Sequence, residues 1–358
     1  MKFHYNTSYA QTFAFLRYPA DRAWYGLLAV LLIAAPFVLS KFYVGELAYL
    51  FILCIACCGL MMLTGFTSQV SLGHAAFAGI GAYAHALLLA QGVPWLLSLP
   101  AAGALAGLAG LAIGLPAVRV SGLYLAMVTL AFSFIVEHVI GRWKSLTGGF
   151  SGMAVPDAVI FGVDIGGLKG FYFTCLVVLA LVIILLANLA RSRTGRALIG
   201  VRDSEAAAHA LGIHVAGYKA LAFVISATVC GLAGALFAHH LKFLTPEAFG
   251  LLLSMEFVLA VVIGGLGSLH GAVFGGVLIA VLPAFISALK PLLPARIAQQ
   301  SGLEIFVFGL VLVLFVLFEP RGLYGRWLKI RGFLDTFPLY RRDTFRRGKS
   351  YMRSERYR

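Results

Sequence analysis

Residues 171–190 read FYFTCLVVLALVIILLANLA, an unbroken run without a charged side chain. A bilayer core is about 30 Å thick and a helix rises about 1.5 Å per residue, so some 20 apolar residues cross it. We therefore interpret Phe171–Ala190 as a transmembrane helix. The rest of the chain agrees, because 61% of its 358 residues are hydrophobic and only 12% are charged, with a mean hydropathy of +0.94. Soluble domains are about 25% charged, so the composition excludes a soluble globular protein.

Similar apolar stretches recur along the chain. Candidate spans cover residues 24–42, 46–64, 72–91, 95–115, 121–140, 169–190, 218–238, 251–266, 269–289 and 302–318. The first is interpreted as a retained helix, since no small-residue cleavage site follows it. The segment 251–266 is short and ends in glycines, so it is either a span or half of a broken or re-entrant helix. We predict an all-α integral membrane protein, a polytopic bundle of about 8–10 transmembrane helices with broken segments.

Positive charge divides the chain into three parts. Lys and Arg gather in an N-terminal arm (1–23), in the loop 191–219 of the membrane domain (24–320), and in the tail 321–358. Short basic segments stay in the cytoplasm. All three basic segments are therefore placed on the cytoplasmic side, and the numbers of spans between them are even, as that placement requires. Arg142 and Lys144 are an exception, because they fall on the outer side of the membrane. The tail is interpreted as touching anionic lipid rather than nucleic acid.

Regularly spaced glycines predict close helix packing. Gly103, Gly107, Gly110 and Gly114 lie on one helix face, and Gly267, Gly271 and Gly275 repeat every four residues. Small residues let helix backbones approach closely in lipid. The five cysteines fall inside predicted spans without a His/Cys set at zinc spacing, so we interpret them as core residues and predict no metal site.

Two polar, glycine-containing stretches interrupt the apolar pattern. The first is TGFTSQVSLGH at 64–74, and the second is GGLGSLHG at 264–271. Broken helices at corresponding places in two halves point to a transporter's substrate pathway, but both stretches could equally be turns at the membrane surface. His74 either lines a polar path or is a satisfied core residue. The pathway candidates from these stretches are Gln69, Ser71, Gly73, His74, Gly264, Gly265, Gly267 and Ser268.

The span 121–140 carries one carboxylate, Glu137. A carboxylate at membrane depth is expensive and usually faces the bundle interior, although Glu137 could instead lie at the interface beside Arg142. We include it among the pathway candidates.

The loop 191–219 contains a short helical pattern. Asp203 or Ser204 can cap a helix that starts at Glu205, continues through alanines and stops near Gly212. So short a helix is marginal alone, which favours docking on a partner protein. The chain itself has no phosphate loop: Gly348-Lys349-Ser350 lacks the first glycine and the preceding strand. We therefore expect this chain to bind no cofactor and to have no enzymatic activity.

The run Glu205-Ala206-Ala207…Gly212 resembles the coupling-helix motif of ABC importer permeases, with Gly212 one residue later than usual. Other matching stretches are Gln69–Phe77, Gly122–Phe132, Thr147–Gly149, Arg202-Asp203 and Gly264–Ser268. Together they resemble the LivM-type permeases of branched-chain amino acid importers over residues 46–320. The resemblance implies that Arg202, Asp203, Glu205, Ala206, Ala207 and Gly212 couple to the ATPase, and it adds Tyr124 and Thr129 to the pathway candidates.

The same resemblance implies a complex in a bacterial inner membrane. Its other members would be a LivH-type permease, two cytoplasmic ATPases and a periplasmic amino-acid-binding protein. Expected substrates are leucine, isoleucine and valine, while relatives of this pattern also carry urea, short amides or aromatic carboxylates.

Two other classes remain as alternatives. An ion-coupled secondary transporter would use intramembrane carboxylates, with Glu137 and Glu256 as candidates. A membrane enzyme would need a paired catalytic set. The nearest sets are His239-His240, which point to different helix faces, and His209…His214, which lie in the docking loop.

Overall fold

The computed structural model describes residues 19–117, 120, 122–160, 163–164, 166–289 and 322–336, with isolated positions between 306 and 318. Its helices are α2 (Pro19–Val38), α3 (Lys41–Thr67), α4 (His74–Ala90), α5 (Trp95–Ala117), α6 (Leu123–Arg142), α7 (Lys144–Thr147), α8 (Leu168–Arg191), α9 (Arg193–Asp203), α10 (Glu205–Ala210), α11 (Val215–Leu241), α12 (Leu251–Gly264), α13 (Leu269–Leu289) and α16 (Gly322–Thr336). Two 3₁₀ turns, η1 (Gly149–Ser151) and η2 (Pro246–Phe249), and four two-residue strands complete it. The strands are β1 (Met153–Ala154), β2 (Val159–Ile160), β3 (Val163–Asp164) and β4 (Phe243–Leu244).

Within these residues, seven helices are long and apolar enough to cross a membrane, and α2 and α4 contribute two shorter apolar segments. The all-α polytopic prediction is therefore confirmed. Each predicted span from 24–42 to 269–289 coincides with a helix to within a few residues, while most of 302–318 lies outside the described residues. For the segment 251–266, α12 alone has 14 residues, and together with η2 it gives an apolar segment of 19 residues, Pro246–Gly264, that is long enough to cross a membrane, with an extended Gly250 between the two parts.

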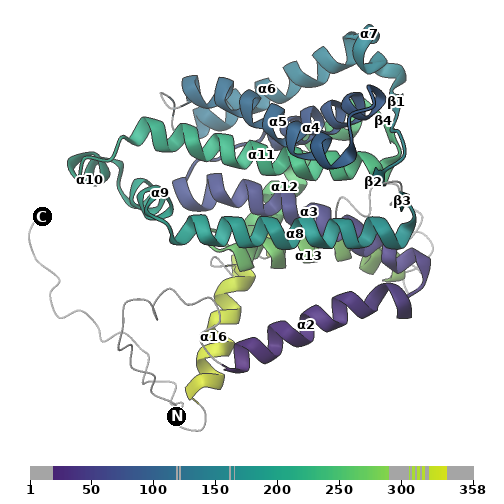
Figure 1. Cartoon of the computed structure of the whole chain (residues 1–358). Helices are drawn as coiled ribbons and strands as arrows, with labels where there is room; N and C mark the ends of the chain where they lie inside the picture. Colours follow the sequence, from purple (N-terminus) through teal and green to yellow (C-terminus); the bar gives the residue numbers. More distant parts are fainter. Residues whose placement is uncertain are drawn as a thin grey trace, which may run out of the picture.

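Two helices form the centre of the bundle. In the apolar stretch of each spanning helix, 78% of the residues of α3 and 67% of those of α11 are buried, whereas in the other spans between 28% and 44% are buried. Helix α11 packs against α3, α4 and α5, and α3 also packs against α8, α12 and α13. Figure 1 shows α3 and α11 between a layer containing α4, α5 and α6 and a layer containing α8 and α13. The outer helices expose apolar side chains, as lipid contact allows.

The glycine stripe of α5 lies against α11. A Cβ on Gly107 would collide with the Thr228 side chain, and one on Gly103 would lie 2.9 Å from Leu232. The predicted packing face is therefore confirmed. In the second stripe, Gly271 and Gly275 lie against α12 in the same way. Gly267 is an exception, because it lies in the turn between α12 and α13 with φ +87°.

The bundle has two distinct ends (Figure 1). We call the end that carries α9 and α10 the α10 end, and the end that carries α7 and the short strands the α7 end. Helix α2 starts at the α10 end, where the Tyr25 hydroxyl lies 2.8 Å from His270 Nε2, and the ring of Tyr324 in α16 stacks on His270. The first described helix, the 191–219 loop and α16 therefore share one end, as the charge pattern predicts.

Candidate functional site

The first predicted helix break enters the interior of the bundle. Helix α3 ends at Thr67, Ser68 adopts a left-handed conformation with φ 54°, and α4 begins only at His74. Ser71 and His74 are completely buried. His74 contacts Ser226, which lies near the middle of α11. The chain thus turns back from the α10 end and starts α4 at mid-depth, which is why α4 is shorter than its neighbours.

His74 joins three helices through one chain of hydrogen bonds. The Ser226 hydroxyl donates to the Gly59 carbonyl of α3 at 2.7 Å, so it must accept from His74 Nε2, also at 2.7 Å. His74 Nδ1 then accepts from the Ser71 hydroxyl at 2.8 Å. Both ring nitrogens are satisfied with the imidazole neutral. The arrangement therefore favours the interpretation of His74 as a satisfied core residue that holds the break together.

Hydroxyl groups of neighbouring helices satisfy the backbone of the break. The Leu72 N–H donates to Thr129 Oγ1 of α6, and the Ala75 N–H donates to Ser254 Oγ of α12, both at 3.0 Å. A Cβ on Gly73 would collide with the Thr129 carbonyl. Irregular backbone at membrane depth is tolerated only where protein satisfies it. The break is therefore built jointly by α4, α6, α11 and α12.

Two buried polar atoms near this network lack partners among the described residues. Thr67 Oγ1 donates to the Leu63 carbonyl at 2.6 Å and lies 3.1 Å from the Gln69 side-chain amide, which leaves the other polar atom of that amide unpaired, as is the Ser133 hydroxyl one turn after Thr129. Buried donors without partners cost about 1–3 kcal/mol each. They are the polar groups here that remain available to a bound molecule or water.

The other pathway candidates lie elsewhere. Gly264, Gly265, Gly267 and Ser268 form the α12–α13 turn, which packs on Gly65 at the α10 end. Tyr124 is 72% exposed near the start of α6. Glu137 lies towards the α7 end, with its carboxylate near Gly250. The two glycine-rich interruptions are therefore not equivalent, because one is a break at mid-depth and the other is a turn at one end.

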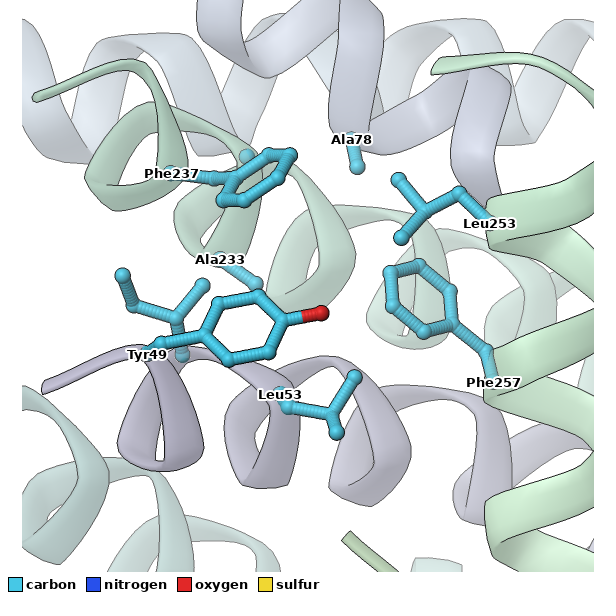
Figure 2. A pocket seen from close by; sticks show the side chains of 9 residues that line it. Tyr49, Leu53, Ala78, Ala233, Phe237, Leu253 and Phe257 are labelled. Atoms are coloured by element: carbon cyan, nitrogen blue, oxygen red, sulfur yellow. The ribbon is translucent and has the colours of Figure 1, made fainter. Parts of the chain in front are cut away.

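A small cavity lies between α3, α4, α11 and α12, next to this network (Figure 2). Its volume is about 10 Å³, and it is lined by Tyr49, Ile52, Leu53, Ala78, Ala233, Gly234, Phe237, Leu253 and Phe257. The Tyr49 hydroxyl points into it, and the remaining lining groups are apolar. The cavity thus offers no charged group to bind an ion or a zwitterion, and we interpret it as a packing space.

Helix α10 has the ends that its sequence predicts. Ser204 Oγ accepts from the Ala207 N–H at 3.2 Å, so Ser204 rather than Asp203 caps the helix. At the other end Gly212 has φ +80°, and the Ile213 N–H donates to the Ala208 carbonyl at 3.0 Å. This is the Schellman arrangement that favours glycine, and it explains why the helix stops there.

Two side-chain contacts hold the α9–α10 segment to the central helices. Arg202 Nη1 donates to the Gly65 carbonyl of α3 at 3.1 Å, and its guanidinium pairs with Asp203 at 2.9 Å. Lys219 Nζ of α11 lies 2.6 Å from Glu205 Oε1. Gly65 and Lys219 were not among the sequence-based candidates, because nothing in the local pattern signals a contact across so many residues.

The outer surface of α10 combines small apolar residues with the exposed Glu205 and His209. Ala208 is buried against the bundle, while Ala206 and Ala207 are exposed. Leu211 is 81% exposed, and Figure 1 shows α10 beyond the ends of α8 and α11. Sequence reasoning missed Leu211, although a leucine beside a short polar helix is a usable signal. The arrangement is a shallow, partly apolar protrusion suited to a groove on another protein.

Comparison with known proteins places these features in a family. The family model described as "Branched-chain amino acid transport system / permease component" matches residues 42–316. The high-affinity branched-chain amino acid transport system permease protein LivM of Escherichia coli K12 is 30% identical over 321 residues, covering 83% of this chain and 73% of that protein. LivM of Salmonella typhimurium has the same identity and coverage. The probable branched-chain amino acid transport permease protein LivH of Methanocaldococcus jannaschii is 27% identical over 307 residues, covering 82% and 95%. No solved structure matches the chain.

Proposed function

Because this chain belongs to the branched-chain amino acid transport permease family, with LivM proteins among its relatives, we propose that it is a membrane-spanning subunit of an ATP-driven importer. Residues 24–320 form part of the pathway for leucine, isoleucine and valine. A LivH-type permease completes the pathway, two cytoplasmic ATPases supply the energy, and a periplasmic binding protein delivers the substrate. The permease itself performs no covalent chemistry and binds no cofactor.

The observation that carries this proposal is helix α10. It is a capped helix of six residues at one end of the bundle, with exposed alanines and a leucine, and it is held by Glu205 to α11 and by Arg202 of the preceding α9 to α3. A helix this short is not stable alone, and its outward apolar surface has no function in a single chain. Docking of Ala206, Ala207 and Leu211 on an ATPase subunit gives that surface a function.

The same proposal sets the orientation of the chain. The α10 end and the loop 191–219 face the cytoplasm of a bacterium whose inner membrane holds the complex, and we place the arm 1–23 and the tail 321–358 on the same side from their charge. The α7 end, with Arg142 and Lys144, then faces the periplasm. The concentration of Lys and Arg in the arm, the loop 191–219 and the tail of the sequence supports this choice.

Co-purification of the ATPase with the co-expressed permease tests the docking role. Leu211→Asp places a charge in the proposed interface and should abolish co-purification. Leu146→Asp makes the same change on an exposed leucine of α7 at the opposite end and should leave it intact. Equal co-purification with both variants contradicts docking through α10.

Uptake into vesicles decides the mechanism and the substrate. ATP inside the vesicles should drive uptake of labelled leucine, isoleucine and valine when binding protein is added outside. Preference for urea, short amides or aromatic carboxylates would keep the importer but change its substrate. Uptake by the purified chain with an ion gradient and without ATPase would instead favour a secondary transporter that uses Glu137 or Glu256, both of which are half-buried.

A further inference from the structure

Three segments that are far apart in the sequence meet at Arg202. The residue belongs to α9, which directly precedes α10, and its Nη1 donates to the carbonyl of Gly65 near the end of α3. The last four carbonyls of a helix have no partner within it, and a cation near them is favourable. Arg202 therefore satisfies the end of α3, three residues before the break at 68–73.

The turn between α12 and α13 lies at the same point. A Cβ on Gly65 would lie 2.7 Å from the Gly267 backbone nitrogen, and a Cβ on Gly267 would lie 3.0 Å from Arg202 Nη1. The Gly267 N–H also contacts Met61 Sδ at 3.2 Å. The turn is thus packed on the last turns of α3 without space for a side chain. Arg202, the end of α3 and this turn therefore lie at one point of the bundle.

The orientation of the guanidinium is fixed from a second side. Asp203 Oδ1 accepts from Arg202 Nε at 3.0 Å, and the ion pair measures 2.9 Å. A planar guanidinium held on one edge by a carboxylate presents its other edge in a defined direction. Here that other edge meets Gly65.

We infer that Arg202 is the positioning residue through which a displacement of the α9–α10 segment reaches the two glycine-rich interruptions of the bundle. Its bond to Gly65 carries the displacement to α3 and hence to the break that His74 holds. The turn at Gly267, which packs on Met61 and Gly65 of α3, carries the displacement on to α12 and α13. Glu205 and Lys219 form a separate anchor to α11. This inference rests on the proposed function, because it assigns the contact that transmits the action of the ATPase.

The test compares four variants of the co-expressed complex. Arg202→Gln removes the charge and the bond to Gly65. Arg202→Lys keeps the positive charge but removes the planar guanidinium that bonds to Asp203 and Gly65 at the same time. Asp203→Asn keeps the bond to Gly65 and removes only the ion pair. Arg193→Gln removes an equally charged, exposed residue from the same helix and serves as the control.

Three quantities are measured: ATPase co-purification, ATP-driven uptake relative to ATP hydrolysis, and amide hydrogen exchange in peptides covering 62–72 and 262–270. For Arg202→Gln we expect normal co-purification, uptake per ATP reduced about tenfold, and faster exchange in both peptides. Arg202→Lys should be intermediate. Asp203→Asn keeps the bond to Gly65 but weakens the hold on the other edge of the guanidinium, so it should also be intermediate. Arg193→Gln should resemble the wild type.

Either of two results overturns the inference. Unchanged exchange in both peptides of Arg202→Gln means that the residue does not hold the two interruptions. Faster exchange combined with wild-type uptake per ATP means that the bond between Arg202 and Gly65 does not transmit the action of the ATPase to the bundle. Failure of the proposed function is distinguishable, because the ATPase would then not co-purify even with the wild type, and the inference would fall with it.

Discussion

The ammonium group of Lys219 lies 2.6 Å from the Glu205 carboxylate, and its side chain is only 6% exposed although that of Glu205 is 54% exposed. The pair joins the first residue of α10 to α11, one of the two central helices. A buried ammonium requires a carboxylate or several acceptors around it. Glu205 is therefore both the start of α10 and the counter-charge of a buried lysine.

Removing only one partner of this pair should destabilise the protein. We expect Glu205→Ala to lower the free energy of unfolding by about 1–2 kcal/mol, less than for a fully buried pair because solvent screens Glu205. Glu205→Ala combined with Lys219→Met should recover part of this loss, since no buried charge remains. Thermal unfolding of the four species in detergent measures the coupling. Strict additivity contradicts the assigned pairing.

Charge reversal at the same position should act more strongly. Glu205→Arg places two cations together at the start of α10, where positive charge also opposes the helix dipole. We expect loss of ATPase co-purification while the bundle remains folded. Size-exclusion chromatography supplies the control for folding. Retention of the ATPase by this variant would show that α10 docks without its anchor to α11.

The hydrogen-bond chain through His74 should stabilise the break. Ser226→Ala leaves His74 Nε2 buried without a partner, at a cost of about 1–3 kcal/mol, while the Gly59 carbonyl keeps its bond within α3. Ser98→Ala is the matched control, because Ser98 is equally buried but bonds only to a carbonyl of its own helix. Thermal unfolding should therefore show a larger loss for Ser226→Ala than for Ser98→Ala. Equal losses would count against the role of His74 as the centre of the break.

The glycine stripe of α5 predicts a steric effect. Gly107→Leu forces a side chain into Thr228 of α11, where overpacking costs about 1–3 kcal/mol or more. Gly26→Leu in α2 places the same side chain where nothing lies within 4 Å and should be tolerated. Expression level and thermal unfolding compare the two variants. A stable Gly107→Leu protein would mean that α5 can move away from α11.

Substitution of Gly212, at the end of α10, should act through backbone conformation and not through a steric clash. A Cβ on Gly212 meets nothing within 4 Å, yet its φ of +80° costs an L-residue about 1 kcal/mol. We expect Gly212→Ala to weaken ATPase co-purification and Gly212→Asn to weaken it less, because asparagine tolerates this conformation. Gly200→Ala, inside α9 with ordinary helical backbone, should have no such effect. Equal results for Gly212→Ala and Gly200→Ala would contradict a docking role for this helix end.

Much of this molecule is readable from the sequence alone. The spans follow from composition, because crossing a bilayer needs a local run of apolar residues that any window of the sequence reveals. The limits of α10 are also local, since Ser204 and Gly212 act on backbone groups within a few residues. The glycine stripes likewise predict which helix faces pack, although not which helix each face meets.

The tertiary structure decided how the interruptions are used. The sequence presents 64–74 and 264–271 as two equivalent breaks, but only the first returns to mid-depth, where His74 meets Ser226, 152 residues away. The second is a turn at the α10 end, where it meets Gly65 and Arg202. Hydrogen bonds between groups this distant depend on which helices lie side by side and at what depth. The packing of all the helices sets that arrangement, and no local pattern encodes it.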